Sequence, residues 1–498
     1  MSRPYDLVIL GSGFAGSLLG LLLQKRGLSV LVIDRHRHPR FAIGESSTPA
    51  ADFILESLCD EYDLPELRPL SRYGSWCRER PQVSRGLKRG FSYFHQREGE
   101  RFATGPNHER ELLVAASAND EVGDTHWYRA DVDRFIAQLF VEAGGQLWEG
   151  TTVESIESGS NWELICGHEG ISTRAQGLFL VDGTGGNSGL VKTLGLTSKV
   201  EELSTHSRSV FAHFQDVRHW AEVLDELRFS RSDHPYPCDQ AALHHIIDGG
   251  WMWMLRFDNG ITSVGWTLDE RRHPLPTQVT PREEWQQILD RYPSVSRQLR
   301  SATPALPFTA AAPIARTGRL QRLVSPAAGA NWALLPHTAG FIDPFYSSGI
   351  AQSLLGVESL AAIFSESHST ERGEKELLRY AQRRQQETRL IDQLVALAYQ
   401  TMGRDPRLLH AASMLYFSAA TSFEAGRRRG EKGAFLLADN AAFRGIVDEI
   451  CRTLPGEEAA AGLIDEWITQ VETMVRPWNT VGLFHPQQPH MYWHTAAK

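Results

Sequence analysis

Tyr5-Asp6-Leu7-Val8-Ile9-Leu10-Gly11-Ser12-Gly13-Phe14-Ala15-Gly16 is the stretch that decides the fold. Its apolar, β-branched first half predicts a buried strand, and the glycines after Leu10 predict a tight turn. Leucines at helical spacing from Ser17 to Lys25 predict a helix, and the apolar run Leu28 to Ile33 predicts a second strand that ends at Asp34. Strand, glycine turn, helix, strand and terminal acid together are typical of a βαβ unit that binds a dinucleotide.

Each part of this unit has a physical task in holding a dinucleotide. Gly11 permits the tight turn, Gly13 lets the backbone approach a pyrophosphate, and Gly16 allows the helix to pack closely on the strand. The helix N-terminus holds the phosphates, and the terminal acid accepts hydrogen bonds from a ribose. A glycine turn with only a structural role is the alternative. The position at the N-terminus favours FAD over NAD by analogy. The cofactor-binding residues predicted here are Gly11, Gly13, Phe14, Ala15, Gly16 and Asp34.

The composition excludes several classes of protein. The chain has 498 residues, 42% of them apolar and 22% charged, which fits a globular protein and excludes a disordered or coiled-coil chain. The net charge of −9 gives no electrostatic footprint for nucleic acid. The five cysteines form no C-x-x-C pair and the nineteen histidines no H-E-x-x-H spacing, so we expect neither disulfides nor a metal site. Arg427 to Arg429, flanked by glycines, are expected on a solvated loop.

No segment is typical of export or membrane insertion. Val8 to Leu23 is apolar enough to pass for the core of a signal peptide, but Asp6 precedes it and no small-residue cleavage site follows it. We find no other run that is long and apolar enough to span a bilayer. We therefore expect a cytoplasmic protein with small-molecule partners, without a membrane and without nucleic acid.

The rest of the chain predicts an α/β (α+β) fold in three parts: a Rossmann-type FAD-binding domain, a β-sheet substrate domain and a helical C-terminal region. Asp258-Asn259-Gly260 between two strand-like runs is a strong hairpin signal. Helical periods dominate from Lys375 onward. We expect an FAD-binding module over residues 1–365 and a helical region that covers the substrate pocket over 366–498. Within the module we expect dinucleotide-binding segments at 1–50, 125–200 and 310–365, and sheet or pocket segments at 65–120 and 205–305.

Two further turns are expected near the cofactor. Gly177 to Val181 predicts a strand that leads into Asp182-Gly183-Thr184-Gly185-Gly186, where glycines allow backbone to approach a ligand. A plain surface turn is the alternative. Gly349 to Phe364 carries apolar residues at helical period, so the amides around Ser348 and Gly349 open a helix and form an anion nest. A well-capped helix behind the cofactor is the alternative for this segment.

Three motifs resemble those of the flavin-dependent halogenases. Phe341-Ile342-Asp343-Pro344-Phe345-Tyr346-Ser347-Ser348-Gly349 is similar to the F-x2-P-x2-S-x-G stretch that lines the path between flavin and substrate. Trp251-Met252-Trp253-Met254-Leu255-Arg256 is similar to the W-x-W-x-I-P signature, with arginine in place of the proline. Gly86-Leu87-Lys88-Arg89-Gly90-Phe91-Ser92-Tyr93 resembles the lysine-bearing segment of the phloroglucinol-type phenol halogenases. The resemblance covers most of residues 5–355.

The resemblance implies roles for individual residues. Lys88 is the implied catalytic residue, because its ammonium can hydrogen-bond or capture hypohalous acid; a lysine in such a loop is otherwise usually a solvated charge. Arg129, followed by Asp133, resembles an arginine beside the cofactor, with a helix-surface salt bridge as the alternative. The implied halide-binding residues are Ser347, Ser348 and Gly349. The implied pocket and tunnel residues are Trp251, Trp253, Phe341, Pro344 and Tyr346. The further implied cofactor-binding residues are Arg40, Glu45, Ser46, Arg129, Asp182, Gly183, Asp343, Gly349 and Ile350.

Two departures from the family pattern bear on substrate and cofactor. Tryptophan halogenases place a glutamate at the position of Tyr346, and its absence favours a phenol, which is activated by its own hydroxyls. His337 stands where many relatives carry the acid of a glycine-aspartate pair that holds the ribityl chain, which implies a modest affinity for FAD.

The resemblance also implies a reaction and its partners. FAD, reduced by a separate NAD(P)H-dependent flavin reductase, gives a flavin hydroperoxide with oxygen, and chloride or bromide attacks it to form hypohalous acid. Lys88 then delivers the halogen to a small phenolic substrate, free or carrier-bound, in natural-product biosynthesis. The sequence leaves a homodimer open. The alternatives are an FAD-dependent aromatic monooxygenase, a flavoprotein of the geranylgeranyl-reductase type and a flavin-binding protein without turnover.

Overall fold

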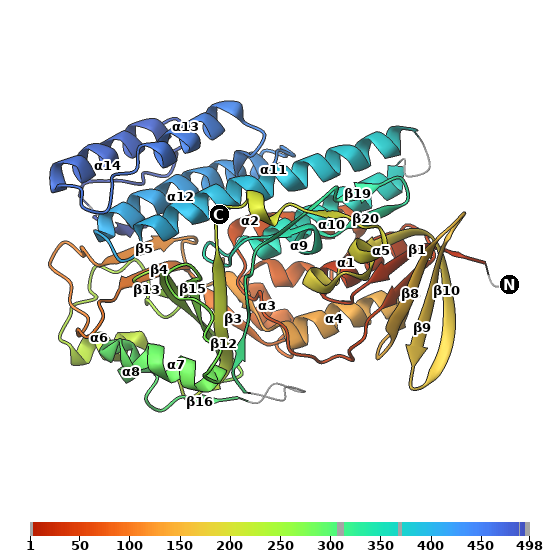
Figure 1. Cartoon of the computed structure of the whole chain (residues 1–498), viewed down its shortest axis with the longest axis horizontal. Helices are drawn as coiled ribbons and strands as arrows, with labels where there is room; N and C mark the ends of the chain where they lie inside the picture. Colours follow the sequence, from red (N-terminus) through yellow and green to blue (C-terminus); the bar gives the residue numbers. More distant parts are fainter. Residues whose placement is uncertain (1–2, 306–312, 367–370, 488, 494–498) are drawn as a thin grey trace.

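The computed structural model describes residues 3–305, 313–366, 371–487 and 489–493. In Figure 1 a parallel sheet lies at the right, a second sheet lies towards the left, and long helices from the C-terminal part of the chain run across the top. This mixture of layers confirms the α/β (α+β) class. The residue limits of the domains stay a prediction, and parts of the predicted segments lie outside the described residues: 1–2, 310–312, 367–370, 488 and 494–498.

The first sheet is built around the N-terminal strand. Strand β1 (Tyr5–Leu10) pairs in parallel with β2 (Val30–Ile33) on one side and with β10 (Ile171–Asp182) on the other. The helix α1 (Phe14–Lys25) connects β1 to β2, which confirms the βαβ unit. The sheet order is β19-β20-β10-β1-β2-β7; β9 pairs antiparallel with β10, and β8 pairs antiparallel with β9. The remaining strands are β7 (Gln146–Trp148), β8 (Thr152–Ser158), β9 (Trp162–His168), β19 (Ala328–Gly329) and β20 (Trp332–Leu334).

Two helices pack on α1 and complete this part. They are α4 (Arg129–Glu142) and α10 (Gly349–Glu366). A Cβ at Gly20 would lie 3.1 Å from the ring of Phe140, so glycine lets α1 and α4 approach closely. Short elements follow the sheet strands: η2 (Gly185–Asn187), α5 (Gly189–Thr193), η3 (Val200–Glu202) and α9 (Pro336–Ala339). A small sheet of β11 (Thr197–Ser198), β18 (Arg322–Ser325) and β21 (Gly340–Phe341) lies beside them.

The second sheet has the order β16-β12-β15-β14-β13-β4-β5-β22, with β17 also paired to β12. The predicted hairpin is confirmed, because β14 and β15 pair antiparallel across the turn at Gly260. The strands of the second sheet are β4 (Gly90–His95), β5 (Glu111–Ala115), β12 (Ser207–Gln215), β13 (Ala242–Ile247), β14 (Gly250–Arg256), β15 (Thr262–Asp269), β16 (Thr303–Pro304), β17 (Ala315–Arg316) and β22 (Met491–Tyr492). The helices of this part are α6 (Trp220–Glu226), α7 (Pro281–Asp290) and α8 (Pro293–Gln298).

The second sheet separates two hydrophobic cores. Trp251, Trp253 and Leu255 belong to the core shared with the first sheet, whereas Met252 and Met254 between them belong to the outer core. This alternation follows from the pleat of a strand, which points successive side chains to opposite faces. Residues of β14 therefore fall into an inner set, which faces the cofactor part of the molecule, and an outer set.

The segment between the two sheets carries elements that bring the predicted lysine to the site. Strand β3 (Arg85–Lys88) pairs antiparallel with β6 (Asp124–Trp127), and Lys88 lies opposite Asp124. The preceding helical elements are α2 (Pro49–Tyr62), η1 (Arg68–Ser71) and α3 (Tyr73–Glu79). Helix α3 was not predicted, because the glycines, prolines and arginines around it hide its helical period.

The C-terminal part is mainly helical, as predicted, but two details differ. Strand β22 adds to the second sheet in parallel with β5. Arg427 lies inside helix α12, and its guanidinium forms an ion pair of 2.7 Å with Glu358 at side-chain exposures of only 5% and 10%, so the predicted solvated loop is wrong there. The helices are α11 (Glu371–Thr401), α12 (Pro406–Arg428), η4 (Phe435–Leu437), α13 (Ala441–Arg452) and α14 (Ala461–Val475). No described helix is long and apolar enough to cross a membrane.

Candidate active site

The glycine turn after β1 has the geometry that the sequence predicts. Gly11 has a φ of +96°, a conformation that side chains other than glycine rarely adopt. A Cβ at Gly16 would lie 2.0 Å from the carbonyl oxygen of Gly11, so the helix and the turn are in close contact there. Gly13 faces two guanidinium groups, since a Cβ there would lie 3.4 Å from Arg40 and 3.6 Å from Arg129. The Asp133 carboxylate lies beside them, 3.8 Å from the same point, and the two guanidinium groups suit a pyrophosphate.

Asp34 stands at the end of β2 beside this turn. Its carboxylate accepts hydrogen bonds of 2.8 Å from the backbone amides of Ser12 and His36. Burial raises the pKa of this carboxyl, but Arg40 and the hydrogen bonds outweigh that effect and lower it. Arg40 lies 3.6 Å from both Asp34 and Asp133, and its buried Nε has no hydrogen-bond partner among the described residues. An ionised acid for a ribose and an unsatisfied guanidinium for a phosphate both fit FAD.

Arg129 is held at the same turn and not on a helix surface. Its guanidinium forms two hydrogen bonds to Asp133, of 2.8 and 2.9 Å, and donates to the carbonyl oxygens of Ile43 and Gly44. It lies 4.7 Å from the ring centroid of Phe14. The group is largely buried, so the alternative of a plain surface salt bridge is wrong. The arginine ties α4 to the turn and to the loop that follows β2.

The second glycine turn packs on the first. The amide of Gly183 donates to the carbonyl oxygen of Leu10 at 2.8 Å, which places the two turns in contact. Asp182 accepts from the amide of Thr184 and from Ser188, and so fixes the turn. The ring of His337 contacts the carbonyl oxygen of Gly183 at 2.9 Å, and burial lowers the pKa of His337 to about 4. A neutral imidazole therefore occupies the position at which many relatives carry an acid.

Glu45 and Ser46 lie on a loop that joins the cofactor turn to the second sheet. The Glu45 carboxylate is buried and contacts the ring of His213 on β12 at 2.9 Å. The Glu45 carbonyl oxygen accepts from the amide of Trp127 on β6, and Ser46 forms a β-bridge with His126. The loop is thereby fixed on both sides, and the next residue, Ser47, reaches the predicted catalytic lysine.

Lys88 ends β3 with a side chain that is 0% exposed. Its Nζ donates to the carbonyl oxygen of Ser47 at 2.6 Å and lies 4.0 Å from the ring centroid of Phe91. Burial, together with the charge of Lys88, lowers the pKa of His126 to about 3 and that of His244 well below its ordinary value. The ammonium is therefore buried beside neutral rings and a carbonyl oxygen, so the solvated-charge alternative is wrong.

A narrow cavity lies near this lysine. Lys88 is not one of its lining residues, but Nζ is bonded to Ser47, the neighbour of Thr48 in the wall, and lies 4.0 Å from the ring centroid of Phe91 in the wall. The volume of about 30 Å³ is room for about two water molecules. The lining residues are Thr48, Pro49, Ala50, Phe91, Val114, Ala116, Tyr416, Phe417, Ala420, Thr421, Glu424 and Phe435. Strands β4 and β5 form one wall of this cavity, and α2 and α12 form the others.

The carboxylate of Asp343 fixes the loop from Phe341 to Gly349 by hydrogen bonds. Asp343 accepts from the amide of Phe345 at 3.0 Å, from Ser207 at 2.5 Å and from Tyr399 at 2.9 Å. These contacts tie the loop to β12 and α11. The Asp343 carboxylate therefore fixes this loop, and the role of Asp343 in FAD binding stays a prediction.

The Asp343 carboxyl makes a testable contribution to the pH dependence of the free energy of unfolding. Burial raises its pKa to about 6, although the bonds from Ser207 and Tyr399 act against this. The folded protein keeps this proton where the unfolded chain has lost it, so the stabilisation is full below about pH 4 and is lost as pH rises through about 6. Relative to the wild type, FAD-free Asp343→Asn is expected to gain about 3 kcal/mol of unfolding free energy between about pH 4 and pH 7. Urea unfolding of both proteins measures this difference, and a difference that stays constant with pH contradicts it.

The predicted halide nest has an unusual backbone. Ser347 has a φ of +54°, and the next two residues lead into α10. A residue other than glycine in this region costs about 1–3 kcal/mol and is more common at functional sites. Ser347 and Ser348 are buried, whereas Gly349 is exposed and Ile350 is again buried. The first amides of α10 therefore face an opening at Gly349, and their partial positive charge suits an anion or the cofactor.

A substitution at Gly349 distinguishes a nest that binds a ligand from a helix start with only a structural role. A Cβ there meets nothing within 4 Å, so the protein itself has room for an alanine. We expect Gly349→Ala to keep the melting temperature of the FAD-free protein and to weaken FAD binding or halide-dependent turnover about tenfold, because the methyl group fills the opening. Flavin titration and initial rates against halide concentration check this. An alanine variant with wild-type values in all of them would show that the nest holds no ligand.

The two tryptophans of β14 form part of a buried aromatic wall. Trp251 donates from Nε1 to Tyr399 at 3.1 Å and packs edge-on against Phe345 at 5.1 Å. Trp253 donates to Ser263 at 3.1 Å, and the two indoles lie 5.9 Å apart. Arg256, which replaces the motif proline, donates to the carbonyl oxygen of Val217 on the outer side of the sheet. The departure at Arg256 therefore leaves the tryptophan face unchanged.

Phe341, Pro344 and Tyr346 lie along the same loop. Phe341 lies beneath the guanidinium of Arg322 at 5.3 Å. The carbonyl oxygen of Pro344 accepts from the amide of Ser347 at 2.9 Å. Tyr346 is buried and stacks on Tyr416 at 4.0 Å with the rings 6° from parallel. Tyr346 therefore lies directly behind a ring that lines the cavity, and it does not line the cavity itself.

Sequence reasoning missed several side chains at this site. Tyr416 and Phe417 of α12 line the cavity, and Tyr399 of α11 connects Asp343 to Trp251. The sequence gives no role to Tyr416 and Phe417, because aromatic residues at helical spacing are more often part of a core. Only the packing of α11 and α12 over the second sheet brings them to the site.

Comparison with known proteins places the chain in a family. A family profile described as FAD dependent oxidoreductase matches residues 6–327, which is more than half of the chain. The protein therefore belongs to the FAD-dependent oxidoreductases, and FAD is its cofactor. This agrees with the two glycine turns and the arginines at Gly13.

Within that family the chain is similar to flavin-dependent halogenases, as the sequence motifs imply. It is 34% identical over 368 residues to a tetracycline 7-halogenase of Kitasatospora aureofaciens. It is 29% identical over 398 residues to a monodechloroaminopyrrolnitrin halogenase of Pseudomonas fluorescens. These matches cover 72% and 78% of this chain, which spans only 63% and 66% of the length of the two relatives.

The fold is also that of a solved halogenase structure. The halogenase PltM in complex with phloroglucinol and FAD superposes with a TM-score of 0.84 at 23% identity, covering 98% of this chain and 99% of that one. A TM-score of 0.84 is also found for a PltM mutant with FAD, at 24% identity and 96% coverage of each chain. The helical C-terminal part is thus included in the shared fold.

Proposed function

We propose that this protein is a flavin-dependent halogenase that installs chlorine or bromine on an electron-rich phenol. The observation that carries the proposal is the position of Lys88, fully buried with its Nζ bonded to the Ser47 carbonyl oxygen and 4.0 Å from the ring centroid of Phe91, which lines the cavity. A buried lysine beside the wall of a substrate cavity is well suited to hold a polar reagent next to an aromatic ring.

The residues at the cofactor turn support binding of FAD, which when reduced supplies, with oxygen and halide, the hypohalous acid used in the reaction. Gly13, Arg40 and Arg129 suit the pyrophosphate, and Asp34 suits a ribose. The opening at Gly349 suits the halide. Lys88 holds the hypohalous acid by its ammonium protons and directs the halogen to the substrate carbon.

The cavity wall favours a phenolic ring. Phe91 and Phe417 offer aromatic faces, and the polar groups of the wall include Thr48, Thr421 and Glu424. These groups suit the hydroxyls of a phenol, and the Thr48 hydroxyl has no hydrogen-bond partner in the described part of the chain. Tyr346 replaces a catalytic glutamate of tryptophan halogenases, and a phenol does not need that acid. Because the cavity is narrow, side chains such as Phe417 must move when a ring enters.

The proposal includes the partners of the reaction. A separate NAD(P)H-dependent flavin reductase supplies the reduced FAD, and the phenol arrives free or attached to a carrier. The two bacterial relatives named above support halogen transfer, and the PltM complex with phloroglucinol supports a phenol as the substrate. A cytoplasmic location fits a reaction that consumes cellular NAD(P)H.

A product analysis with a panel of phenols tests the proposal. The protein is incubated with FAD, a flavin reductase, NADH and bromide, and each phenol is followed by mass spectrometry. We expect at least one phenol to give a product with the bromine isotope pattern. Products that gain oxygen instead would identify an aromatic monooxygenase and reject the proposal. Boiled protein and reactions without bromide serve as controls.

A further inference from the structure

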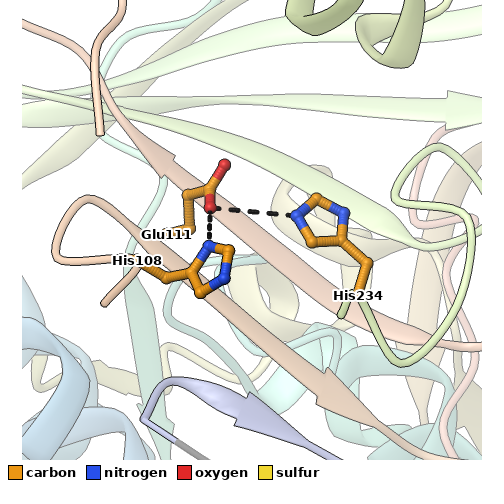
Figure 2. Close-up of side chains that lie close together, drawn as sticks. All are labelled: His108, Glu111 and His234. Atoms are coloured by element: carbon orange, nitrogen blue, oxygen red, sulfur yellow. Dashed lines mark hydrogen bonds and ion pairs between the residues drawn. The ribbon is translucent and has the colours of Figure 1, made fainter. Parts of the chain in front are cut away.

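Three side chains converge on the second sheet, at a distance from the site described above. His108 precedes β5, Glu111 begins that strand, and His234 lies in the loop between α6 and β13 (Figure 2). Figure 2 shows the two imidazole rings pointing at the same carboxylate from different segments. All three side chains are buried, and Glu111 is only 1% exposed.

The nitrogen and oxygen atoms of this group are close enough to share one ion. One ligand atom from each residue lies within 4.8 Å of the others. His234 Nε2 lies 3.8 Å from Glu111 Oε2, and His108 Nδ1 contacts the same oxygen. Neither ring nitrogen of His234 has a hydrogen-bond partner among the described residues, and the same holds for Glu111 Oε1. Buried polar atoms without partners cost free energy, so this arrangement calls for a ligand.

We propose that His108, Glu111 and His234 bind a Zn²⁺ ion. His108 Nδ1, His234 Nε2 and the Glu111 carboxylate are the ligands, with both carboxylate oxygens available. Imidazole and carboxylate suit zinc, and zinc distances near 2.1 Å in a tetrahedron place ligand atoms about 3.4 Å apart. The separation of His234 from Glu111 is close to this, and the contact between His108 and Glu111 lengthens when an ion enters.

The contact of the other ring nitrogen of His108, Nε2, supports a metal site. Its Nε2 lies 2.6 Å from a carboxylate oxygen of Asp233. Histidines that bind a metal almost always donate their other ring N–H to such a group, which fixes the ring and the tautomer. Asp233 is also the neighbour of His234 in the chain, so one loop supplies a ligand and the support for another ligand. Asp233 is therefore a positioning residue.

A proton shared within the group is the metal-free arrangement. Without an ion, a doubly protonated His108 donates from Nδ1 to Glu111 and from Nε2 to Asp233. That charged form satisfies Glu111 Oε2 and Asp233. It leaves both nitrogens of His234 without a hydrogen-bond partner in the described chain, with Nε2 3.8 Å from Glu111. An ion replaces the proton and adds His234 to the bonded group, which the proton alone does not do.

The proposed site fixes a loop that supports the lysine strand. Two residues after His234, the Tyr236 hydroxyl donates to the carbonyl oxygen of Phe91 at 2.6 Å. The amide of Arg89, which follows Lys88, donates to the carbonyl oxygen of Gln240 at 2.7 Å. An ion bound in this loop therefore stabilises the backbone that directly follows Lys88, without contacting the substrate.

Metal binding by the full chain without an affinity tag tests the proposal. The protein is treated with a chelator and dialysed, and ZnCl₂ is added in a calorimeter and in thermal melts. We expect about one Zn²⁺ per chain and a higher melting temperature with zinc. His234→Ala and Glu111→Gln are expected to lose at least about 100-fold in affinity, and Asp233→Asn about 10- to 100-fold. His485→Ala, which removes an exposed histidine, is the matched control and keeps wild-type binding.

Cobalt gives a readout that does not depend on activity or on the fold of a variant. Co²⁺ added to the wild-type protein is expected to give the visible absorption of a four-coordinate site, and Zn²⁺ is expected to abolish it. The proposal is overturned if the wild type neither binds zinc nor shifts its melting temperature with zinc. It is also overturned if folded His234→Ala and His485→Ala bind zinc equally.

Discussion

Lys88→Ala is expected to lower the rate of halogenated product formation by about 10²–10⁴-fold, the range for loss of a positioned proton-transfer group. The Nζ of Lys88, next to Phe91 of the cavity wall, can hold hypohalous acid, and alanine leaves a methyl group there. FAD binding and NADH-dependent oxygen uptake are expected to stay near wild-type values, since the cofactor turn is built from other residues. Product formation by mass spectrometry and oxygen uptake are measured side by side.

Two controls make this result specific to the lysine. Lys88→Met keeps most of the side-chain volume without the charge, so it separates loss of the ammonium from loss of packing. Lys192→Ala removes an exposed lysine of α5 and is expected to behave as the wild type. If folded Lys88→Ala and Lys88→Met halogenate at the wild-type rate, the role of Lys88 is rejected even where the protein is a halogenase.

Gly16→Ala is expected to weaken FAD binding by at least about 100-fold, which corresponds to about 2.7 kcal/mol. The added Cβ would lie 2.0 Å from the carbonyl oxygen of Gly11. Because that atom belongs to the backbone of the turn, the turn has to move, and Gly11 and Gly13 move with it. A flavin fluorescence titration of the purified variant measures the dissociation constant.

Gly445→Ala is the matched control for Gly16→Ala. Gly445 lies in helix α13, and a Cβ there meets nothing within 4 Å. The variant is expected to bind FAD as the wild type does, with an equal or higher stability. Wild-type FAD affinity in folded Gly16→Ala would contradict the assignment of this turn as the pyrophosphate site.

The cofactor part could be predicted because its signals are local. The strand, the glycine turn, the helix and Asp34 follow one another in about 30 residues, and the structure confirms this unit. Arg40 and Arg129 are a different case, because Arg40 reaches Gly13 from the loop after β2 and the position of Arg129 depends on how α4 packs on α1. The resemblance pointed to these residues, and the geometry supports them by charge and burial.

The substrate part could be predicted only in pieces. The motifs identify Lys88 and Trp251, but nothing in the sequence shows that α12 closes the cavity with Tyr416 and Phe417. The histidine cluster shows the same limit. His108 and Glu111 are three residues apart, but His234 lies more than a hundred residues further along the chain, so no short spacing rule finds the group. Long-range contacts of this kind arise from topology and not from local pattern.

The central claim is that halogen, and not oxygen, is transferred to a phenol. The most direct measurement is one reaction of phloroglucinol with the protein, FAD, a flavin reductase, NADH, bromide and ¹⁸O₂, analysed by mass spectrometry. The account predicts a product with the bromine isotope doublet and no ¹⁸O, which disappears when bromide is left out. A product that carries ¹⁸O and no bromine while bromide is present would contradict it.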